Sequence, residues 1–277
     1  MKEIEENPDE ILVIGNGFDL NLGLDTSYSN FVKSESFNNI CTNGNTLCQY
    51  LQGKHDLQNW IDIENELKEY EKQLSNNNFQ NEFDDLCKAL IEYLNKIDVS
   101  KLKTTGKAYT TLENLKSSNF LIFDYNYTST VENLLKRFGL PESEIDRRVV
   151  KIHGSLLSNE IIFGIEDSVY LKSPKNIFLK KSASPIFVDV DLNSYLSKAV
   201  KTSFFGHSLG ESDHMYFKDF FGNAANLYHP GVGKIIDIYY YKQQSYYQLQ
   251  AQLDNLANNK LGQLRRLNKV TYIDSSP

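Results

Sequence analysis

With 277 residues, the chain is long enough for one large or two modest domains, and because it has no Pro/Gly/Ser-rich linker we predict a single domain over residues 1–277 that carries an insertion. Hydrophobic residues make up 40% of the chain, but their runs are far shorter than the roughly 18 apolar residues of a membrane-spanning helix, so a membrane protein is not expected. The net charge of −7 argues against a basic nucleic-acid-binding surface, and the acidic first residues, without an apolar signal segment, favour the cytoplasm.

The first predicted element is a buried strand. Residues 11–14 are a β-branched run that ends at the tight turn Gly15-Asn16-Gly17. Much further along, residues 45–118 place apolar side chains at helical spacing, as at Phe83 and Leu86. We therefore predict a helical insertion over approximately residues 45–118.

Strand-like runs return after this insertion, and helical stretches separate several of them. They cover residues 120–125, 149–153, 161–165, 203–206, 234–241 and 270–273. This alternation predicts an α/β fold, a Rossmann-like and mostly parallel sheet flanked by helices. In such sheets ligands bind beyond the carboxyl ends of the strands. Five residues at or just after the ends of apolar runs are therefore of interest: Gly15, Asn126, His153, Gly164 and Gly206.

The first loop has two glycines directly after a strand, which lets the backbone approach a pyrophosphate closely. Gly15, Asn16, Gly17 and Asp19 are therefore candidate nucleotide-binding residues. The third glycine of a G-x-G-x-x-G motif is missing because Leu20 occupies its place, so an ordinary turn is the alternative. For Asp19 we expect hydrogen bonds either from a ribose or from neighbouring amides.

Two candidates for catalysis follow later strands. Asn126 is suited to position a water or an amide group, although it or Thr128 would also serve as a cap of the following helix. His153 stands at a strand end beside Gly154, which suits a general base or a hydrogen-bond partner of a sugar hydroxyl. The alternative for His153 is a purely structural histidine.

The run from Gly206 to His214 has three incompatible interpretations. As a G-x-S-x-G elbow it would expose Ser208 as an esterase nucleophile, but the later histidines lie within about 21 residues of this serine, too close for the usual intervening strands. As a metal site it would use His207, Asp213 and His214, but no H-E-x-x-H pattern completes the set, so we predict no metal. We favour a nucleotide-binding loop in which Gly206, Ser208 and Asp213 contact the ligand, with the roles of His207 and His214 open.

Seven short motifs occur in order along nearly the whole chain. They are I-G-N-G-F-D-L at 14–20, T-S-Y at 26–28, W-I-D-I-E at 60–64, N-Y-T at 126–128, I-H-G at 152–154, F-G-I-E-D at 163–167 and F-G-H-S-L-G-E-S-D-H at 205–214. As an ordered set they resemble the AbiH family of bacterial abortive-infection proteins. Trp60, in the third motif, either closes over a ligand or packs in the core.

The AbiH pattern is similar, more distantly, to the Sir2-like domains of anti-phage NADases. This resemblance implies a Sir2-like fold in which the glycine-rich loop cradles NAD, an asparagine positions water or the nicotinamide ribose, and a histidine acts as base. By position, the residues would be Gly15, Gly17 and Asp19 for the cradle, Asn126 and His153 for catalysis, and Gly206, Ser208 and Asp213 for the adenosine side. The chain lacks the four cysteines of zinc-containing Sir2 deacylases, which argues against peptide deacylation. Phe18 and Asp19 stand where a Sir2 first loop carries small residues, which leaves the pose of NAD open.

The function that the resemblance implies is hydrolysis of NAD to nicotinamide and ADP-ribose in anti-phage defence. The alternative is a non-catalytic sensor that binds NAD or ADP-ribose and signals through a partner or an oligomer. The expected partners are a small-molecule nucleotide, a phage-derived activator and further copies of the chain. Nucleic acid and membrane are not expected as partners.

Overall fold

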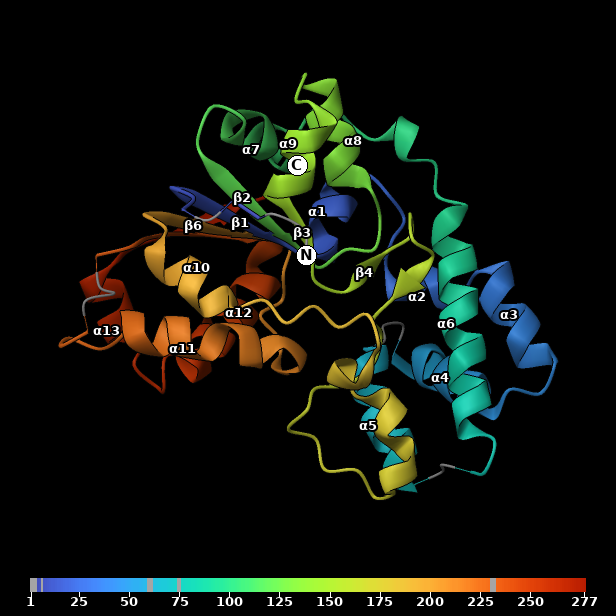
Figure 1. Cartoon of the computed structure of the whole chain (residues 1–277). Helices are drawn as coiled ribbons and strands as arrows, with labels where there is room; N and C mark the ends of the chain where they lie inside the picture. Colours follow the sequence, from blue (N-terminus) through green and yellow to red (C-terminus); the bar gives the residue numbers. More distant parts are fainter. Residues whose placement is uncertain (1–3, 6, 59–61, 74–75, 230–232) are drawn as a thin grey trace. The chain divides into compact units, whose positions relative to one another are not determined.

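The computed structural model describes residues 4, 5, 7–58, 62–73, 76–229 and 233–277 (Figure 1). The chain forms two compact units. Unit 1 consists of Met1–Gly23, Leu102–Ile152 and Asp189–Pro277, and unit 2 of Leu24–Lys101 and His153–Val188. The helical insertion expected at residues 45–118 overlaps unit 2, but the helices of that unit begin at Tyr28, and the helix over Lys107–Leu115 belongs to unit 1.

Unit 1 is built on a six-stranded parallel sheet. Its strands are β1 (Glu10–Ile14), β2 (Phe120–Asp124), β3 (Val149–Lys151), β6 (Lys201–Phe205), β7 (Ile235–Tyr240) and β8 (Lys269–Asp274). In space they follow the order β3-β2-β1-β6-β7-β8. With the strands of this sheet counted along the chain, the order is 3-2-1-4-5-6, which is that of the Rossmann fold. The predicted α/β, Rossmann-like fold is confirmed.

Helices cover both faces of this sheet, as Figure 1 shows. On one side lie α1 (Asn16–Asn21), α7 (Lys107–Leu115), α8 (Thr130–Arg137) and α9 (Glu142–Arg148), and on the other α10 (Leu192–Lys198), α11 (His214–Ala224), α12 (Lys242–Leu256) and α13 (Leu261–Leu267). Every residue of β2 is buried, and so are all residues of β1 except the first. These strands read as continuous apolar runs because helices cover the sheet from both sides.

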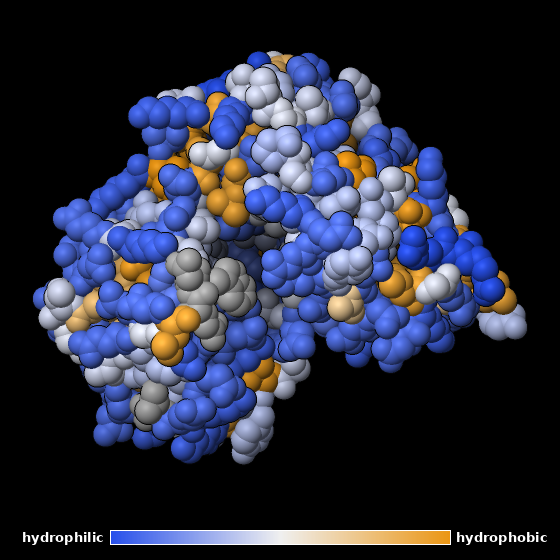
Figure 2. Space-filling view, turned by 180° about the vertical axis from the view of Figure 1, so that it is seen from behind, coloured by the Kyte–Doolittle hydropathy of each residue, from blue (hydrophilic) through white to orange (hydrophobic). Residues whose placement is uncertain are grey.

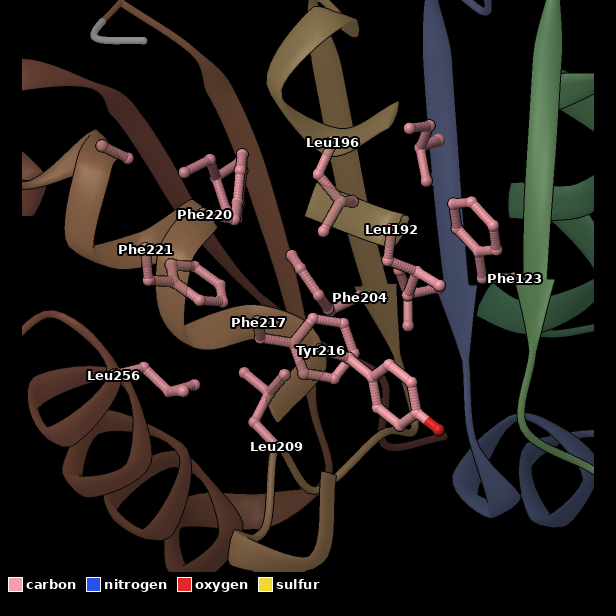
Figure 3. Close-up of a cluster of buried hydrophobic side chains, with 14 of the residues drawn as sticks. Phe123, Leu192, Leu196, Phe204, Leu209, Tyr216, Phe217, Phe220, Phe221 and Leu256 are labelled. Atoms are coloured by element: carbon pink, nitrogen blue, oxygen red, sulfur yellow. The ribbon is translucent and has the colours of Figure 1, made fainter. Parts of the chain in front are cut away.

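The core of unit 1 packs α10, α11 and α12 onto the sheet (Figure 3). Phe204 of β6 contacts two aromatic rings of α11, with ring centroids 5.6 Å from Phe217 and 5.4 Å from Phe221. Leu192 and Leu196 of α10 complete the contact. This apolar layer holds β6 and α11 together, and the loop between them carries residues 206–213.

Unit 2 is mostly helical. Its elements are α2 (Tyr28–Val32), α3 (Glu35–Thr42), α4 (Thr46–Gln58), α5 (Ile63–Gln73), α6 (Phe79–Asn95), the short helices η1 (Val99–Lys101), η2 (Pro174–Leu179) and η3 (Lys181–Ala183), and the strands β4 (Gly154–Ser155) and β5 (Glu160–Ile161). The two strands form an antiparallel pair. Unit 2 therefore adds no strand to the parallel sheet.

The strand predicted over residues 161–165 is wrong beyond Ile161. Gly164 has φ +148, and a Cβ on it would lie 2.1 Å from the carbonyl oxygen of Leu179. Ile165 then donates a backbone hydrogen bond to the same carbonyl, at 2.8 Å. The apolar run belongs to a loop of unit 2 because the backbone turns at Gly164 to meet residue 179.

Candidate active site at the carboxyl edge of the sheet

The order of the strands changes direction between β1 and β6. From β1 the sheet grows toward β2 and β3 on one side and toward β6, β7 and β8 on the other. The registers pair Ile14, the last residue of β1, with both Asp124 of β2 and Phe205 of β6. The loops after β1, β2 and β6 therefore begin side by side at one edge. Ligands of open α/β sheets bind at such a switch point.

The loops after β1 and β6 touch backbone to backbone. A Cβ on Gly17 would lie 2.6 Å from the Cα of Gly206, and a Cβ on Gly15 would lie 2.8 Å from the Gly206 carbonyl oxygen. Gly206 itself has φ +64, and a Cβ there would lie 2.3 Å from the amide nitrogen of Phe18. Only glycine fits at these three positions, because each lacks room for a side chain.

Three backbone N–H groups of the first turn donate hydrogen bonds within the protein. Gly15 N donates to Phe205 O at 3.1 Å, Gly17 N to Gly206 O at 2.9 Å, and Phe18 N to Gly15 O at 2.9 Å. Asn16, the first residue of α1, is exposed. The glycines of this turn thus fasten the β1 loop to the β6 loop.

Asn126 lies in the loop after β2 and is 7% exposed. Its backbone N–H donates to Asp124 Oδ1 at 2.8 Å, and its side-chain Nδ2 donates to Gly15 O at 3.2 Å. The N-cap residue of α8 is Ser129, so the alternative role of Asn126 as cap of this helix is wrong. The carboxamide of Asn126 instead joins the β2 loop to the glycine turn.

Lys151, the last residue of β3, binds carbonyl oxygens of the Asn126 loop. Its Nζ lies 2.5 Å from Asp124 Oδ2, 3.3 Å from Asn126 O and 3.4 Å from Glu132 Oε1, and it also donates to Thr128 O. Burial lowers the pKa of Lys151, but Asp124 and Glu132 raise it above its ordinary value. The lysine is therefore an ammonium group that neutralises carboxyls and binds two carbonyls of one loop.

Asp19 of α1 is 1% exposed and bonded to the same loop. Thr128 Oγ1 donates to Asp19 Oδ2 at 2.6 Å, and Thr130 Oγ1 donates to Thr128 Oγ1 at 3.0 Å. Among the residues that the structure describes, no hydrogen-bond partner of Asp19 Oδ1 is found. Burial raises the pKa of Asp19 to about 6, although Thr128 and Lys151 oppose the rise.

The loop after β6 is ordered by its own polar groups. Leu209 N donates to His207 Nδ1 at 3.0 Å, and His207 Nε2 lies 3.5 Å from Asp213 Oδ2. The imidazole also meets the ring of Tyr125 edge-on, with centroids 4.4 Å apart. Ser208 is exposed, and its Oγ accepts a hydrogen bond from Gly210 N at 3.2 Å. His207 thus stabilises the conformation of the loop that carries Ser208 and Asp213.

The end of this loop is anchored through His214. Its Nε2 lies 3.0 Å from Leu209 O and 2.9 Å from Gln252 Oε1 of α12. Because both partners are acceptors, this nitrogen carries the proton. A short helical turn, η4 (Glu211–Asp213), separates Ser208 from α11. The serine therefore does not stand at the strand-to-helix elbow that the esterase interpretation requires.

His153 is the first residue of the second segment of unit 2 and follows β3 by two positions. It is 5% exposed, and its carbonyl oxygen accepts a hydrogen bond from Ile162 N at 2.7 Å. The next residue, Gly154, has φ +81 and begins β4. Ile152, just before His153, still belongs to unit 1 and donates to Asp124 O at 2.9 Å. Lys151, which pairs with Asp124, is thus separated from His153 by a single residue in the sequence.

Other motif residues have structural contacts within unit 2. Glu64 forms an ion pair with the buried Lys181, with Oε2 and Nζ 3.1 Å apart. Asp62 Oδ1 accepts from Asn65 N at 3.2 Å at the start of α5. Trp60 lies outside the described residues.

The described part of the chain contains no group of three or more His, Cys, Asp or Glu side chains placed to hold a metal ion. Nor is any described helix both long and apolar enough to cross a membrane. On the face shown in Figure 2, hydrophilic residues predominate and hydrophobic ones are scattered in small groups.

The sequence predicts the glycines and Asn126 as candidate site residues, whereas Lys151 and Asp124 were not predicted and Thr128 was considered only as a helix cap. Asp124 and Lys151 each end a short strand, and that position was the available signal. Thr128 and Asp19 are 109 positions apart, so nothing local connects them. These three residues link the Asn126 loop to α1 and β3.

Comparison with protein-family models identifies a family. The family model described as "Bacteriophage abortive infection AbiH" matches residues 11–86 and 68–229, which include β1, β2, β3 and β6 with the loops that follow them. None of the curated proteins and none of the solved structures compared gives a significant match. Because the matched segments cover well over half of the chain, the protein belongs to the AbiH family of bacteriophage abortive-infection proteins.

Proposed function

We propose that this AbiH protein defends against phage by binding NAD at the β1/β6 switch point and hydrolysing it to nicotinamide and ADP-ribose. The observation that carries the proposal is the meeting of three loops at one sheet edge. Gly17 bonds to Gly206, and Asn126 bonds to Gly15, so the loops after β1, β2 and β6 form one connected surface. In the Rossmann fold this edge receives a dinucleotide.

In this proposal each loop has a separate role. Gly15 and Gly17 hold the β1 loop against the β6 loop, and the exposed Asn16 is the residue of this turn that contacts the dinucleotide. Asn126 positions water or the nicotinamide ribose, and Asp19 accepts a hydrogen bond on the ribose side. On the adenosine side, the contacts come from Gly206, Ser208 and Asp213.

The reaction consumes one water and needs a base. As the bond between ribose C1′ and the pyridinium nitrogen breaks, its electron pair goes to the nitrogen, and nicotinamide leaves as a neutral molecule. Water oxygen bonds to C1′ and its proton passes to His153, which acts as the general base. Such assistance contributes about 10² to 10⁴-fold to a rate. A metal ion has no part in these steps.

The test is release of free nicotinamide from NAD by the purified full-length protein, measured by chromatography. His153→Ala is expected to reduce the rate by about 10² to 10⁴-fold. His55→Ala is the control, because His55 is also a buried histidine of unit 2 and has no place in the proposed site. Normal turnover by a folded His153→Ala protein would refute the assignment of the base.

The second candidate function is a sensor that binds NAD or ADP-ribose without cleaving it. One observation favours it: the glycine turn, Asp19, Asn126 and the Gly206 loop all belong to unit 1, whereas His153 belongs to unit 2. Binding of NAD with no release of nicotinamide, both alone and after addition of lysate from phage-infected cells, would support the sensor. The lysate arm also tests for a phage-derived activator.

A further inference from the structure

The edge of unit 1 that carries Asp19 holds more negative than positive groups. Asp19, Asp124 and Glu132 supply three carboxyls, and Lys151 is the only cation in contact with any of them among the described residues. Lys151 Nζ lies 2.5 Å from Asp124 Oδ2 and 3.4 Å from Glu132 Oε1, so its direct contacts are with these two carboxyls, and it acts on Asp19 only at longer range. Asp19 remains without a direct counter-ion.

The backbone N–H groups that would bind a phosphate at this turn already donate hydrogen bonds within the protein. The N–H groups of Gly15, Gly17 and Phe18 donate to backbone carbonyls of the two adjoining loops. These three amides are therefore already bonded within the protein, which leaves the charge of Asp19 as the feature of this turn that can distinguish between ligands.

In addition, one carboxylate oxygen of Asp19 lacks a hydrogen-bond partner among the described residues. Its side chain is directed at the Asn126 loop, because Oδ2 accepts from Thr128. The other oxygen, Oδ1, is buried and has no hydrogen-bond partner among the described residues. Buried polar atoms normally have partners, and a buried charge without one is costly. A ligand that brings positive charge to this edge would offset that cost.

We propose that the β1/β6 switch point recognises the pyridinium–ribose half of NAD through the negative charge of Asp19, so the site selects N-ribosides whose ring is cationic. This inference rests on the proposed function, because it takes NAD as the ligand of this edge. It predicts a preference for the oxidised, positively charged ring over the reduced, neutral ring of the same shape. The recognised class extends to pyridinium ribosides that carry no phosphate.

The charge of Asp19 would also serve the cleavage step. In the free ligand the positive charge sits on the ring nitrogen, and as the bond to C1′ breaks it moves to C1′ and the ring oxygen of the ribose. A fixed carboxylate near this path stabilises the developing cation without being consumed. Asp19 acts through its field while Thr128 holds it in place.

The test compares two probes by isothermal titration calorimetry on the full-length protein. The probes are nicotinamide riboside and its reduced dihydro form. The variants are Asp19→Asn, which keeps an acceptor for Thr128 but removes the charge, and Glu10→Gln, a control for the loss of one negative charge. Glu10 begins β1, at the opposite end of the strand from Asp19, and pairs with Lys201.

The wild-type protein and Glu10→Gln should bind nicotinamide riboside roughly 10 to 100-fold more tightly than the reduced form, as expected for one charge pair near a protein surface. Asp19→Asn should lose this preference. No preference in the wild type, a preference kept by Asp19→Asn, or no binding of nicotinamide riboside at millimolar concentration would each overturn the inference.

A second measurement needs no variant. The polar and charged groups that surround Asp19 are Thr128 of the Asn126 loop, Lys151 of β3, and Thr130 and Glu132 of α8. Binding of the cation near pH 6 should release protons, because a nearby positive charge favours the carboxylate of Asp19. Titrations in buffers of different ionisation enthalpy measure that release. Its absence would count against the inference.

The outcome is separable from that of the proposed function. NAD cleavage with an unchanged cation preference in Asp19→Asn would keep the hydrolase and refute the inference. A cation preference that depends on Asp19, without any release of nicotinamide from NAD, would support the inference and count against the hydrolase.

Discussion

Asp19→Asn should stabilise the folded protein at neutral pH, because the wild-type carboxylate is ionised there in a buried position. The folded-state pKa of Asp19 is about 6, against 3.8 for an unperturbed aspartate. A pKa unit corresponds to about 1.4 kcal/mol, so the rise of roughly two units means that ionised Asp19 destabilises the fold by about 3 kcal/mol. Asparagine retains the hydrogen bond with Thr128 at no such cost.

The sign follows from proton binding. Between pH 4 and pH 6 the folded state holds the proton on Asp19 while the unfolded state has lost it, so this residue reduces stability as the pH rises. Below about pH 4 both states are protonated, and above about pH 6 the penalty is complete. The advantage of Asp19→Asn should therefore be small at pH 4 and approach about 3 kcal/mol at pH 7.5.

The assay is urea unfolding of both proteins at pH 4 and pH 7.5, followed by circular dichroism. Taking the difference between the two proteins at each pH removes the contributions of all other titrating groups. An advantage of the same size at both pH values, or a wild type more stable than Asp19→Asn at pH 7.5, would refute the reasoning.

Two further substitutions test the framework of the site. Gly206→Ala should destabilise unit 1 by well over the roughly 1–2 kcal/mol that left-handed backbone strain costs, because the new Cβ would lie 2.3 Å from a backbone nitrogen. The control is Gly139→Ala, at φ +89 with open space around it, which should cost only the backbone strain. Equal urea midpoints of the two variants would contradict this prediction. Lys151→Met should cost about 3–5 kcal/mol, because it leaves two carboxyls without their cation. Lys136→Met removes an exposed ion pair and should leave the free energy of unfolding nearly unchanged in the same assay. A loss no larger for Lys151→Met would show that the buried ion pair is dispensable.

A buried carboxylate without a direct counter-ion is more informative about function than one that forms an ion pair. Burial also raises the pKa of Asp124, to about 7, but Asp124 and Glu132 both have Lys151 as a direct counter-ion. Asp19 forms no ion pair among the described residues, and its Oδ1, like Oε2 of Glu132, has no hydrogen-bond partner among them. Proteins tend to retain costly polar groups where function requires them. This contrast is the reason that the proposed recognition centres on Asp19 rather than on its neighbours.

Much of the fold follows from local patterns in the sequence. The apolar runs that became β1, β2 and β6 were found within one or two residues, because strands covered on both faces are apolar throughout. The glycines at 15, 17 and 206 were found as candidates as well. Their reason differs from the expected phosphate contact: they allow two loops to meet backbone to backbone.

The sequence by itself determined the alternation of strands and helices and the residues that end each strand. It could do so because hydrophobic periodicity and the positions of glycines depend on the environment of a short segment. Only the tertiary structure decided that Lys151 pairs with Asp124, since this depends on the register of β3 against β2. It likewise decided that Asp19 meets Thr128, 109 positions away, and that His153 belongs to a second compact unit. Ion pairs and hydrogen bonds between distant segments depend on the packing of whole elements, which a local pattern does not contain.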